Sequence, residues 1–209
     1  MTRWLLTSIV ALAASAALAQ TPQPAPGAPP AAPKTETAKP DAGKAPPDTR
    51  SVDALFERLQ KAEDEDEAKG IANLIERRWL RSNSDVADLL MTRAMTAMQP
   101  REQDLPQAIE LLDRVIGLEP QWAEAYNKRA TAFFMLGDYE RSMLDVRQTL
   151  SREPRHYGAL AGLGQILLSN GDKKHALEAF RKALSLNPRM PMVKGVIDKL
   201  APDVDGRDT

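Results

Sequence analysis

A step of 34 residues recurs through the second half of the chain and constrains its fold more than any other feature. Three prolines, Pro120, Pro154 and Pro188, stand 34 residues apart, preceded by the similar segments IGLE, LSRE and LSLN. Between them, the turn sequence LGDY at 136–139 corresponds to NGDK at 170–173, at the same offset. A fixed step of this length predicts a helical repeat, in which each unit reads helix, Gly-Asp turn, helix, proline.

The first 19 residues, MTRWLLTSIVALAASAALA, differ from the rest of the chain. They carry a lone Arg3, an apolar run from Trp4, and small residues at Ala17 and Ala19. This layout is typical of a secretory signal peptide cleaved before Gln20, and it predicts a periplasmic or secreted protein. The alternative is an uncleaved anchor, but the run is shorter than the roughly 20 apolar residues that span a bilayer. We therefore expect no stable membrane span after cleavage.

Residues 20–50 form a proline- and alanine-rich segment that holds nine of the chain's 16 prolines and almost no bulky apolar side chain. Such a segment buries too little to offset an ordering entropy of about 1–2 kcal/mol per residue. We expect a disordered linker over 20–50, acting as a spacer or, alternatively, as a polyproline ligand.

The charge and the chemical side chains exclude several classes of function. The formal net charge is −1, so no field attracts nucleic acid, and there are no cysteines. The two histidines, His156 and His175, have no partner at metal-ligand spacing, and the carboxylates Asp64 and Asp66 lie in a solvated run. No phosphate-binding glycine loop, nucleophile elbow or HExxH motif occurs. We expect a protein that is not an enzyme and needs no cofactor.

Helical periodicity divides the rest of the chain into units. Residues 51–82 predict an irregular N-terminal helix pair, which lacks the Gly-Asp turn and the closing proline. We expect it to be an end repeat that covers the apolar face of the next unit. The other expected units are a degenerate repeat at 83–120, full repeats at 121–154 and 155–188, a capping helix at 189–201 and a disordered tail at 202–209.

The spacing of aromatic and small residues in the two full units resembles that of the tetratricopeptide repeat family. The residues that carry the resemblance are Tyr126, Ala130, Phe133, Gly137, Asp138, Tyr139, Ser142, Val146 and Pro154, then Leu160, Gly164, Leu167, Gly171, Ala176, Phe180, Ala183 and Pro188. The resemblance implies an all-α fold, a right-handed solenoid of helical hairpins. The whole layout also looks like small exported repeat proteins of Gram-negative bacteria.

The resemblance further implies that the first helix of each unit lines a concave groove that accepts an extended peptide or a helix. The groove residues would be Met91, Met95, Met98, Asn127, Lys128, Thr131, Phe134, Gly162 and Gln165. Some family members grip a terminal carboxylate with basic and amide side chains. The corresponding positions here hold Asp88, Thr92, Glu124, Lys128, Gly158 and Gly162. Only Lys128 suits that task, so a carboxylate clamp is not expected.

The predicted groove changes from methionine-rich to nearly free of side chains, which favours an apolar or amphipathic segment as ligand. An alternative stays open for the methionines, since a Met stripe at helical spacing also suits a core. Helix packing accounts for Gly164 but not for Gly158 and Gly162.

Three hypotheses for function follow. The first is a non-enzymatic protein–protein interaction scaffold of the bacterial cell envelope, whose partners are other envelope proteins. The second is a structural protein that self-assembles through its terminal helices. The third is a regulatory subunit of an envelope enzyme.

Overall fold

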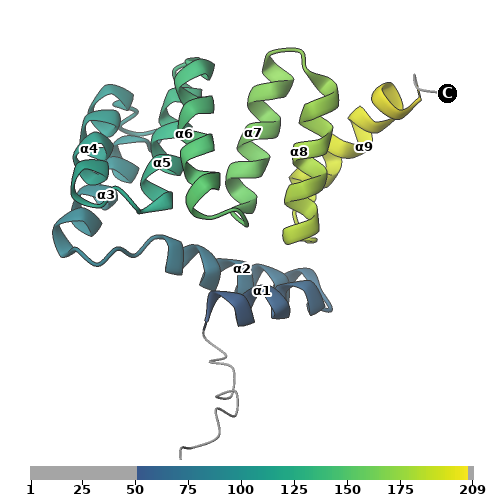
Figure 1. The fold of residues 1–209 in the computed structure, drawn as a ribbon, viewed down its shortest axis with the longest axis horizontal. Helices are drawn as coiled ribbons and strands as arrows, with labels where there is room; N and C mark the ends of the chain where they lie inside the picture. The colour runs from purple at the N-terminus through teal and green to yellow at the C-terminus, as the bar shows by residue number, and fades with distance from the viewer. Residues whose placement is uncertain (1–50, 207–209) are drawn as a thin grey trace, which may run out of the picture. The chain divides into compact units, whose positions relative to one another are not determined.

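Short turns connect the helices of residues 51–206, the part of the chain that the computed structural model describes (Figure 1). This part contains nine α-helices and no strand: α1 (Val52–Lys61), α2 (Glu65–Trp79), α3 (Asp85–Ala97), α4 (Leu105–Leu118), α5 (Ala123–Met135), α6 (Tyr139–Arg152), α7 (Tyr157–Ser169), α8 (Lys173–Leu186) and α9 (Pro191–Asp205). The signal peptide and linker expected over residues 1–50 lie outside the described residues.

The turns between paired helices form where the sequence predicts them. Asp138 and Asp172 begin α6 and α8, and each carboxylate accepts a hydrogen bond from the backbone N–H three residues later. The preceding glycines, Gly137 and Gly171, have φ angles of 78° and 81°. Only glycine adopts this conformation without strain, so the Gly-Asp pair both ends one helix and starts the next.

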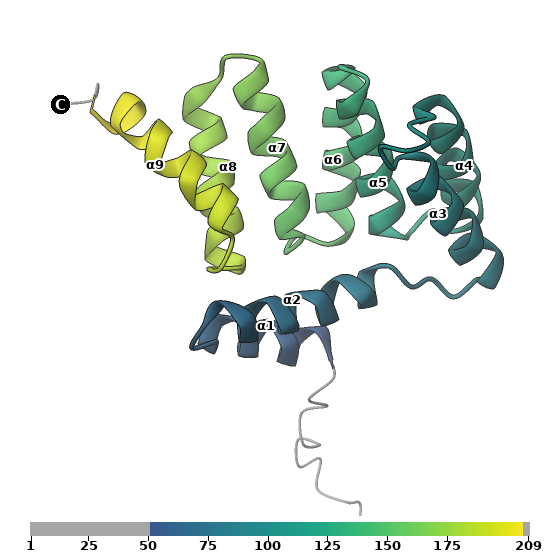
Figure 2. The ribbon, with the colours of Figure 1, turned by 180° about the vertical axis from the view of Figure 1, so that it is seen from behind.

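Helices α3 to α8 stack as three antiparallel hairpins, side by side in Figures 1 and 2. Small residues lie where helices approach closely, and Ala130, Gly164 and Ala176 are all buried. Large residues fill the space between hairpins, among them the buried Phe133 and Phe180. The predicted all-α helical-repeat fold is confirmed.

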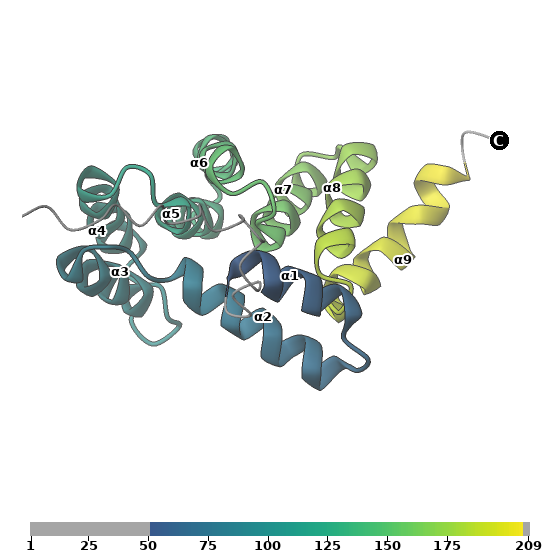
Figure 3. The same cartoon turned by 60° about the horizontal axis from the view of Figure 1, so that its bottom comes forward.

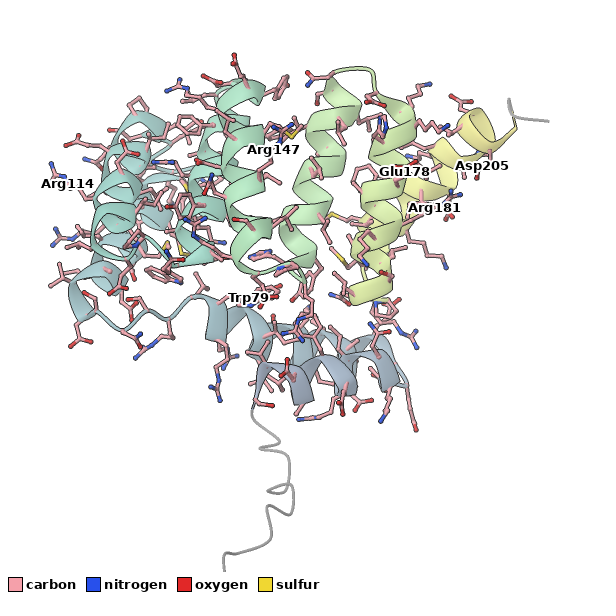
Figure 4. The ribbon with its side chains drawn as sticks, viewed as in Figure 1. Trp79, Arg114, Arg147, Glu178, Arg181 and Asp205 are labelled. Atoms are coloured by element: carbon pink, nitrogen blue, oxygen red, sulfur yellow. The ribbon has the colours of Figure 1, made fainter. Side chains whose placement is uncertain are left out.

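The last helix, α9, covers the end of the stack. Its Val193 and Leu200 are buried against Leu177 and Phe180 of α8. The helix continues to Asp205, beyond the end at residue 201 that the sequence predicted, and the expected tail therefore begins later. Packing of Val204 against the same cluster and a 2.5 Å ion pair between Asp205 and Arg181 account for the extra turn (Figure 4).

The first two helices form an N-terminal hairpin, α1–α2, that runs crosswise beneath the lower ends of the repeat helices (Figures 1 and 3). Its buried apolar face does not cover α3 and α4, as expected, but clusters with three residues from the far half of the chain, Tyr157, Leu186 and Met190. The helix pair was predicted correctly and its position wrongly. Sequence periodicity marks which face of a helix is apolar, whereas the partner of that face is set by contacts between distant residues.

Polar contacts attach the hairpin to the last repeat. The Gln60 side-chain amide donates to the carbonyl oxygens of Ser185 and Leu186, at 2.9 and 2.8 Å. In the opposite direction, Arg189 donates to the carbonyl oxygen of Glu63 at 2.9 Å. The hairpin therefore bridges residues more than 120 positions apart in sequence. Within the described residues, no helix has the length and hydropathy to cross a bilayer.

Candidate functional site

The first helices of the two full repeats, α5 and α7, line a groove with a central hollow of about 130 Å³. The hollow is lined by Asn127, Ala130, Thr131, Phe134, Ser142, Val146, Gly158, Ala159, Gly162, Gln165 and Ile166. Five of the predicted groove residues, Asn127, Thr131, Phe134, Gly162 and Gln165, thus come together. None of the lining side chains carries a charge, so the hollow suits an uncharged group.

The glycines of α7 differ in what surrounds them. A Cβ atom added to Gly164 would lie 2.6 Å from the ring of Phe180, so this glycine is required for packing. A Cβ atom added to Gly162 would meet no atom within 4 Å. Glycine inside a helix is less favourable than alanine by about 1 kcal/mol. Gly162 therefore carries a cost that packing does not explain, and its missing side chain opens the groove.

The predicted methionines divide between core and groove. Met91 is only 2% exposed and belongs to a core cluster with Ala94 and Leu112. Met95 is half-buried and lines a second hollow of about 330 Å³, whose other lining residues are Leu80, Met91, Thr92, Thr96 and Gln99. Met98 packs against the core cluster and does not line that hollow. Of the two alternatives left open for the stripe, Met91 and Met98 follow the core and Met95 follows the groove.

Helix α9 extends the groove beyond the predicted residues. A third hollow of about 280 Å³ lies on the other side of α7, lined by Ala161, Gly162, Gln165, Phe180, Met192, Val193 and Val196. It shares Gly162 and Gln165 with the central hollow, so the two join across the side-chain-poor face of α7. A helix that covers one side of a repeat with apolar residues also presents its neighbouring face to the groove, which is the sequence signal for this extension.

Lys128 is not a free cation in the groove, contrary to the prediction. Its Nζ lies 2.9 Å from Oε1 of Glu124, a carboxylate only 4% exposed. The Asn127 amide donates to the other oxygen of Glu124 at 3.1 Å. Burial acts to raise the pKa of Glu124, but the hydrogen bond with His156 and the charge of Lys128 together hold that pKa below its ordinary value. The lysine charge is therefore used within the protein.

His156 joins the groove to the N-terminal hairpin. Its Nδ1 accepts a hydrogen bond from the backbone N–H of Ala159 at 3.1 Å and caps α7. With Nδ1 as acceptor, the proton resides on Nε2, which donates to Oε2 of Glu124 at 2.7 Å. The ring stacks on Trp79 at the end of α2, with centroids 4.2 Å apart and planes 15° from parallel. Sequence reasoning missed this pair because its members lie 32 residues apart and match no motif.

Two further contacts hold the hairpin at this point, which Figure 4 marks at Trp79. The Trp122 indole donates to the carbonyl oxygen of Trp79 at 2.6 Å. The Tyr157 hydroxyl donates to the Glu76 carboxylate at 3.1 Å. The foot of the groove is thus a polar and aromatic junction built from α2, α5 and α7. Within residues 51–206, no group of three or more His, Cys, Asp or Glu side chains is arranged to hold a metal ion.

Comparison with known proteins gives matches over the repeats and beyond. Sequence models of the tetratricopeptide repeat match residues 101–147 and 157–190. A TPR repeat-containing protein of Rhizobium etli is 37% identical over 158 residues, which cover 76% of each chain.

Among solved structures, the first TPR of Spaghetti (RPAP3) bound to an HSP90 peptide aligns with a TM-score of 0.54 and 16% identity, covering 58% of this chain and 94% of that one. The TPR2B domain of yeast Sti1 in a complex with pHsp70 gives a TM-score of 0.53 and 17% identity, covering 57% and 99%. At these identities the likeness concerns the fold.

Proposed function

The chain belongs to the tetratricopeptide repeat family, and from that premise we propose that it is a non-enzymatic interaction scaffold of the bacterial cell envelope. Its groove would bind a peptide or helix segment of another envelope protein. The location rests on the sequence of residues 1–19, which has the layout of a secretory signal peptide. Regulation of an envelope enzyme is one form that such binding could take.

The observation that carries this proposal is the open space above Gly162. A glycine in mid-helix with nothing near its missing Cβ lowers helix stability and gives no packing in return. The same position joins the central and third hollows into one apolar channel. A binding groove accounts for both facts, because a partner backbone can approach α7 closely only where side chains are absent.

The chemistry of the groove argues for the kind of segment it binds. Two solved relatives are described with bound partners, an HSP90 peptide and pHsp70. In this chain the one basic residue suited to gripping a carboxylate, Lys128, is paired with Glu124. An internal segment with apolar side chains therefore fits better than a charged chain terminus, and Met95 and Met192 provide adaptable contacts at either end of the groove.

Filling the groove tests the proposal. Gly162→Leu adds a side chain where a Cβ meets no atom, so the fold is retained while the channel is blocked. Gly117→Leu is the matched control, since Gly117 is also a helix-interior glycine with open surroundings, but it lies on α4 outside the groove. Both full chains would be cross-linked in cells of a bacterium that produces the protein, and captured proteins quantified by mass spectrometry.

We expect Gly162→Leu to reduce specific cross-linked partners at least tenfold, a loss of about 1.4 kcal/mol or more in binding free energy. Gly117→Leu should capture the same partners as the unmodified chain. Equal capture by both variants would show that partners bind elsewhere, and the groove proposal would then be abandoned.

One observation favours the second hypothesis, self-assembly through an end of the molecule. The N-terminal hairpin leaves the outer face of α3 uncovered, and Val86 and Leu89 are exposed there. Sedimentation of the full chain across concentrations tests it. Association that Val86→Lys with Leu89→Lys abolishes would support an end-to-end contact, and a monomer at all concentrations would exclude it.

A further inference from the structure

The groove is free of charge along its whole length. Its three hollows are lined by apolar, hydroxyl, amide and glycine residues, without one charged side chain. Charged residues make up 27% of the chain, so an uncharged channel through several helices is a distinctive surface. Burying a charge there without a partner would be costly, so the groove selects an uncharged segment.

The chain contains such a segment outside the described residues. Residues 20–33, QTPQPAPGAPPAAP, include six prolines and no charged residue, and the charges resume at Lys34. Proline-rich sequences favour an extended polyproline II helix, in which the backbone carbonyls have no internal hydrogen-bond partner. The binding cost of such a segment is low because much of its conformational freedom is already absent.

The connection between this segment and the groove is short enough for both to meet within one molecule. The linker enters α1 beside the foot of the groove, where Asp53 forms a 2.7 Å ion pair with Arg155, next to the cap of α7. Gly162 lies five residues beyond the start of α7, about 8 Å of helix. Residues 34–50 can span about 50 Å when extended, which exceeds the required distance several-fold.

We propose that residues 20–33 dock in the groove of the same molecule as an extended, polyproline-like segment. The inference rests on the proposed function, since it uses the same groove. The glycine face of α7 admits the backbone, and the half-buried ring pair Phe134–Tyr139, with centroids 5.3 Å apart, packs against proline rings. The Gln165 side chain, which makes no hydrogen bond to any described residue, donates to a carbonyl of the docked segment.

Docking within one chain places a competitor at the groove at all times. A tethered segment has an effective concentration on the order of 1 mM, so even a weak intrinsic affinity gives substantial occupancy. An external ligand must displace the segment before it binds. The groove would thus accept strong partners and reject weak ones.

The absence of cysteine from the chain allows a direct test. A nitroxide spin label is attached to Ala28→Cys in the full chain, and paramagnetic broadening of backbone amide NMR signals is measured. We expect the amide signals of Thr131, Gly162 and Gln165 to broaden several-fold more than that of Gly117 on α4. Adding Gly162→Leu to the labelled chain should remove the difference, while Gly117→Leu should leave it.

The origin of the broadening is settled by a mixed sample, in which labelled chains without nitrogen-15 are combined with unlabelled nitrogen-15 chains. Broadening only within a single chain supports the inference, whereas equal broadening in the mixed sample would assign the contact to a second copy and overturn it. Groove signals no broader than that of Gly117 would also overturn it. If Gly162→Leu still abolishes partner capture in cells, the proposed function stands although self-docking has failed.

Discussion

At the scale of single residues, two glycines of one helix have opposite roles. Gly164 lies against the ring of Phe180, and the contact is so close that even a methyl group at this position would overlap the ring. Gly162 faces open space in the groove. The first glycine is needed for the fold, whereas the second lowers helix stability without a packing benefit.

Alanine substitutions should therefore change stability in opposite directions. We expect Gly162→Ala to raise the free energy of unfolding by up to about 1 kcal/mol, the propensity difference between the two residues in a helix. Gly164→Ala should lower it by about 1–3 kcal/mol, because the ring of Phe180 must move from a packed site. Urea unfolding measures both, and a destabilised Gly162→Ala variant would contradict the description of an open groove.

The residues of the site were predictable to the extent that they follow the repeat. The spacing of the repeat identified Asn127, Thr131 and Gln165, because equivalent positions on successive helices share one face. It did not reveal that Glu124 neutralises Lys128, although their separation of four residues allows an ion pair on any helix. The choice of Lys128 as a free cation failed because sequence spacing shows which contacts are possible and not which of them is buried.

At the scale of elements, the N-terminal hairpin is attached to the repeats mainly through one aromatic side chain. Trp79 stacks on His156 and also contacts the rings of Phe56 and Tyr157, with centroids 6.1 and 5.2 Å away. These rings belong to α1, α2 and the start of α7. Loss of the indole therefore affects the junction more than either partner.

Trp79→Ala should release the hairpin and leave the repeats folded. We expect a loss of about 2–4 kcal/mol at the junction, somewhat below the value for a fully buried tryptophan because Trp79 is half-buried. Hydrogen exchange should then accelerate at least tenfold in α1 and α2 and remain unchanged in α6. Leu74→Ala, on the exposed side of α2, serves as the control. Uniform acceleration through all helices would contradict a separately attached hairpin.

The repeat helices could be predicted because their determinants are local. The Asp caps and the Gly137 and Gly171 turns lie within a few residues of the helix ends that they fix. The position of the hairpin could not be predicted. Its contacts, such as Gln60 with Ser185, join residues 125 positions apart. The extension of α9 depends likewise on Arg181 of another helix.

At the scale of the whole molecule, one buried carboxylate links the groove, the repeats and the hairpin. The folded protein holds the pKa of Glu124 below its ordinary value of 4.5. A depressed pKa in the folded state contributes stability that is fully present above the unfolded value and is lost as the pH falls through the folded value. The junction should therefore weaken in acid.

Glu124→Gln tests this linkage. We expect the variant to be about 1–3 kcal/mol less stable at pH 7, since a charge-assisted hydrogen-bond network loses its charge. Its stability should also change less between pH 5 and pH 3 than that of the unmodified chain, measured by urea unfolding at each pH. Glu178→Gln on the exposed face of α8 should alter neither result (Figure 4). An identical acid dependence for all three proteins would exclude Glu124 as the source.

An α-solenoid ordinarily grows or shrinks by whole repeats, because each unit contacts only its neighbours. Here the hairpin reaches from the Trp122 indole at the start of α5 to Arg189 beyond the end of α8. One added unit between α6 and α7 would separate these two anchoring points by a further helix pair, about 10 Å or more. The hairpin thus acts as a ruler, and the copy number of repeats in this chain is fixed by its length.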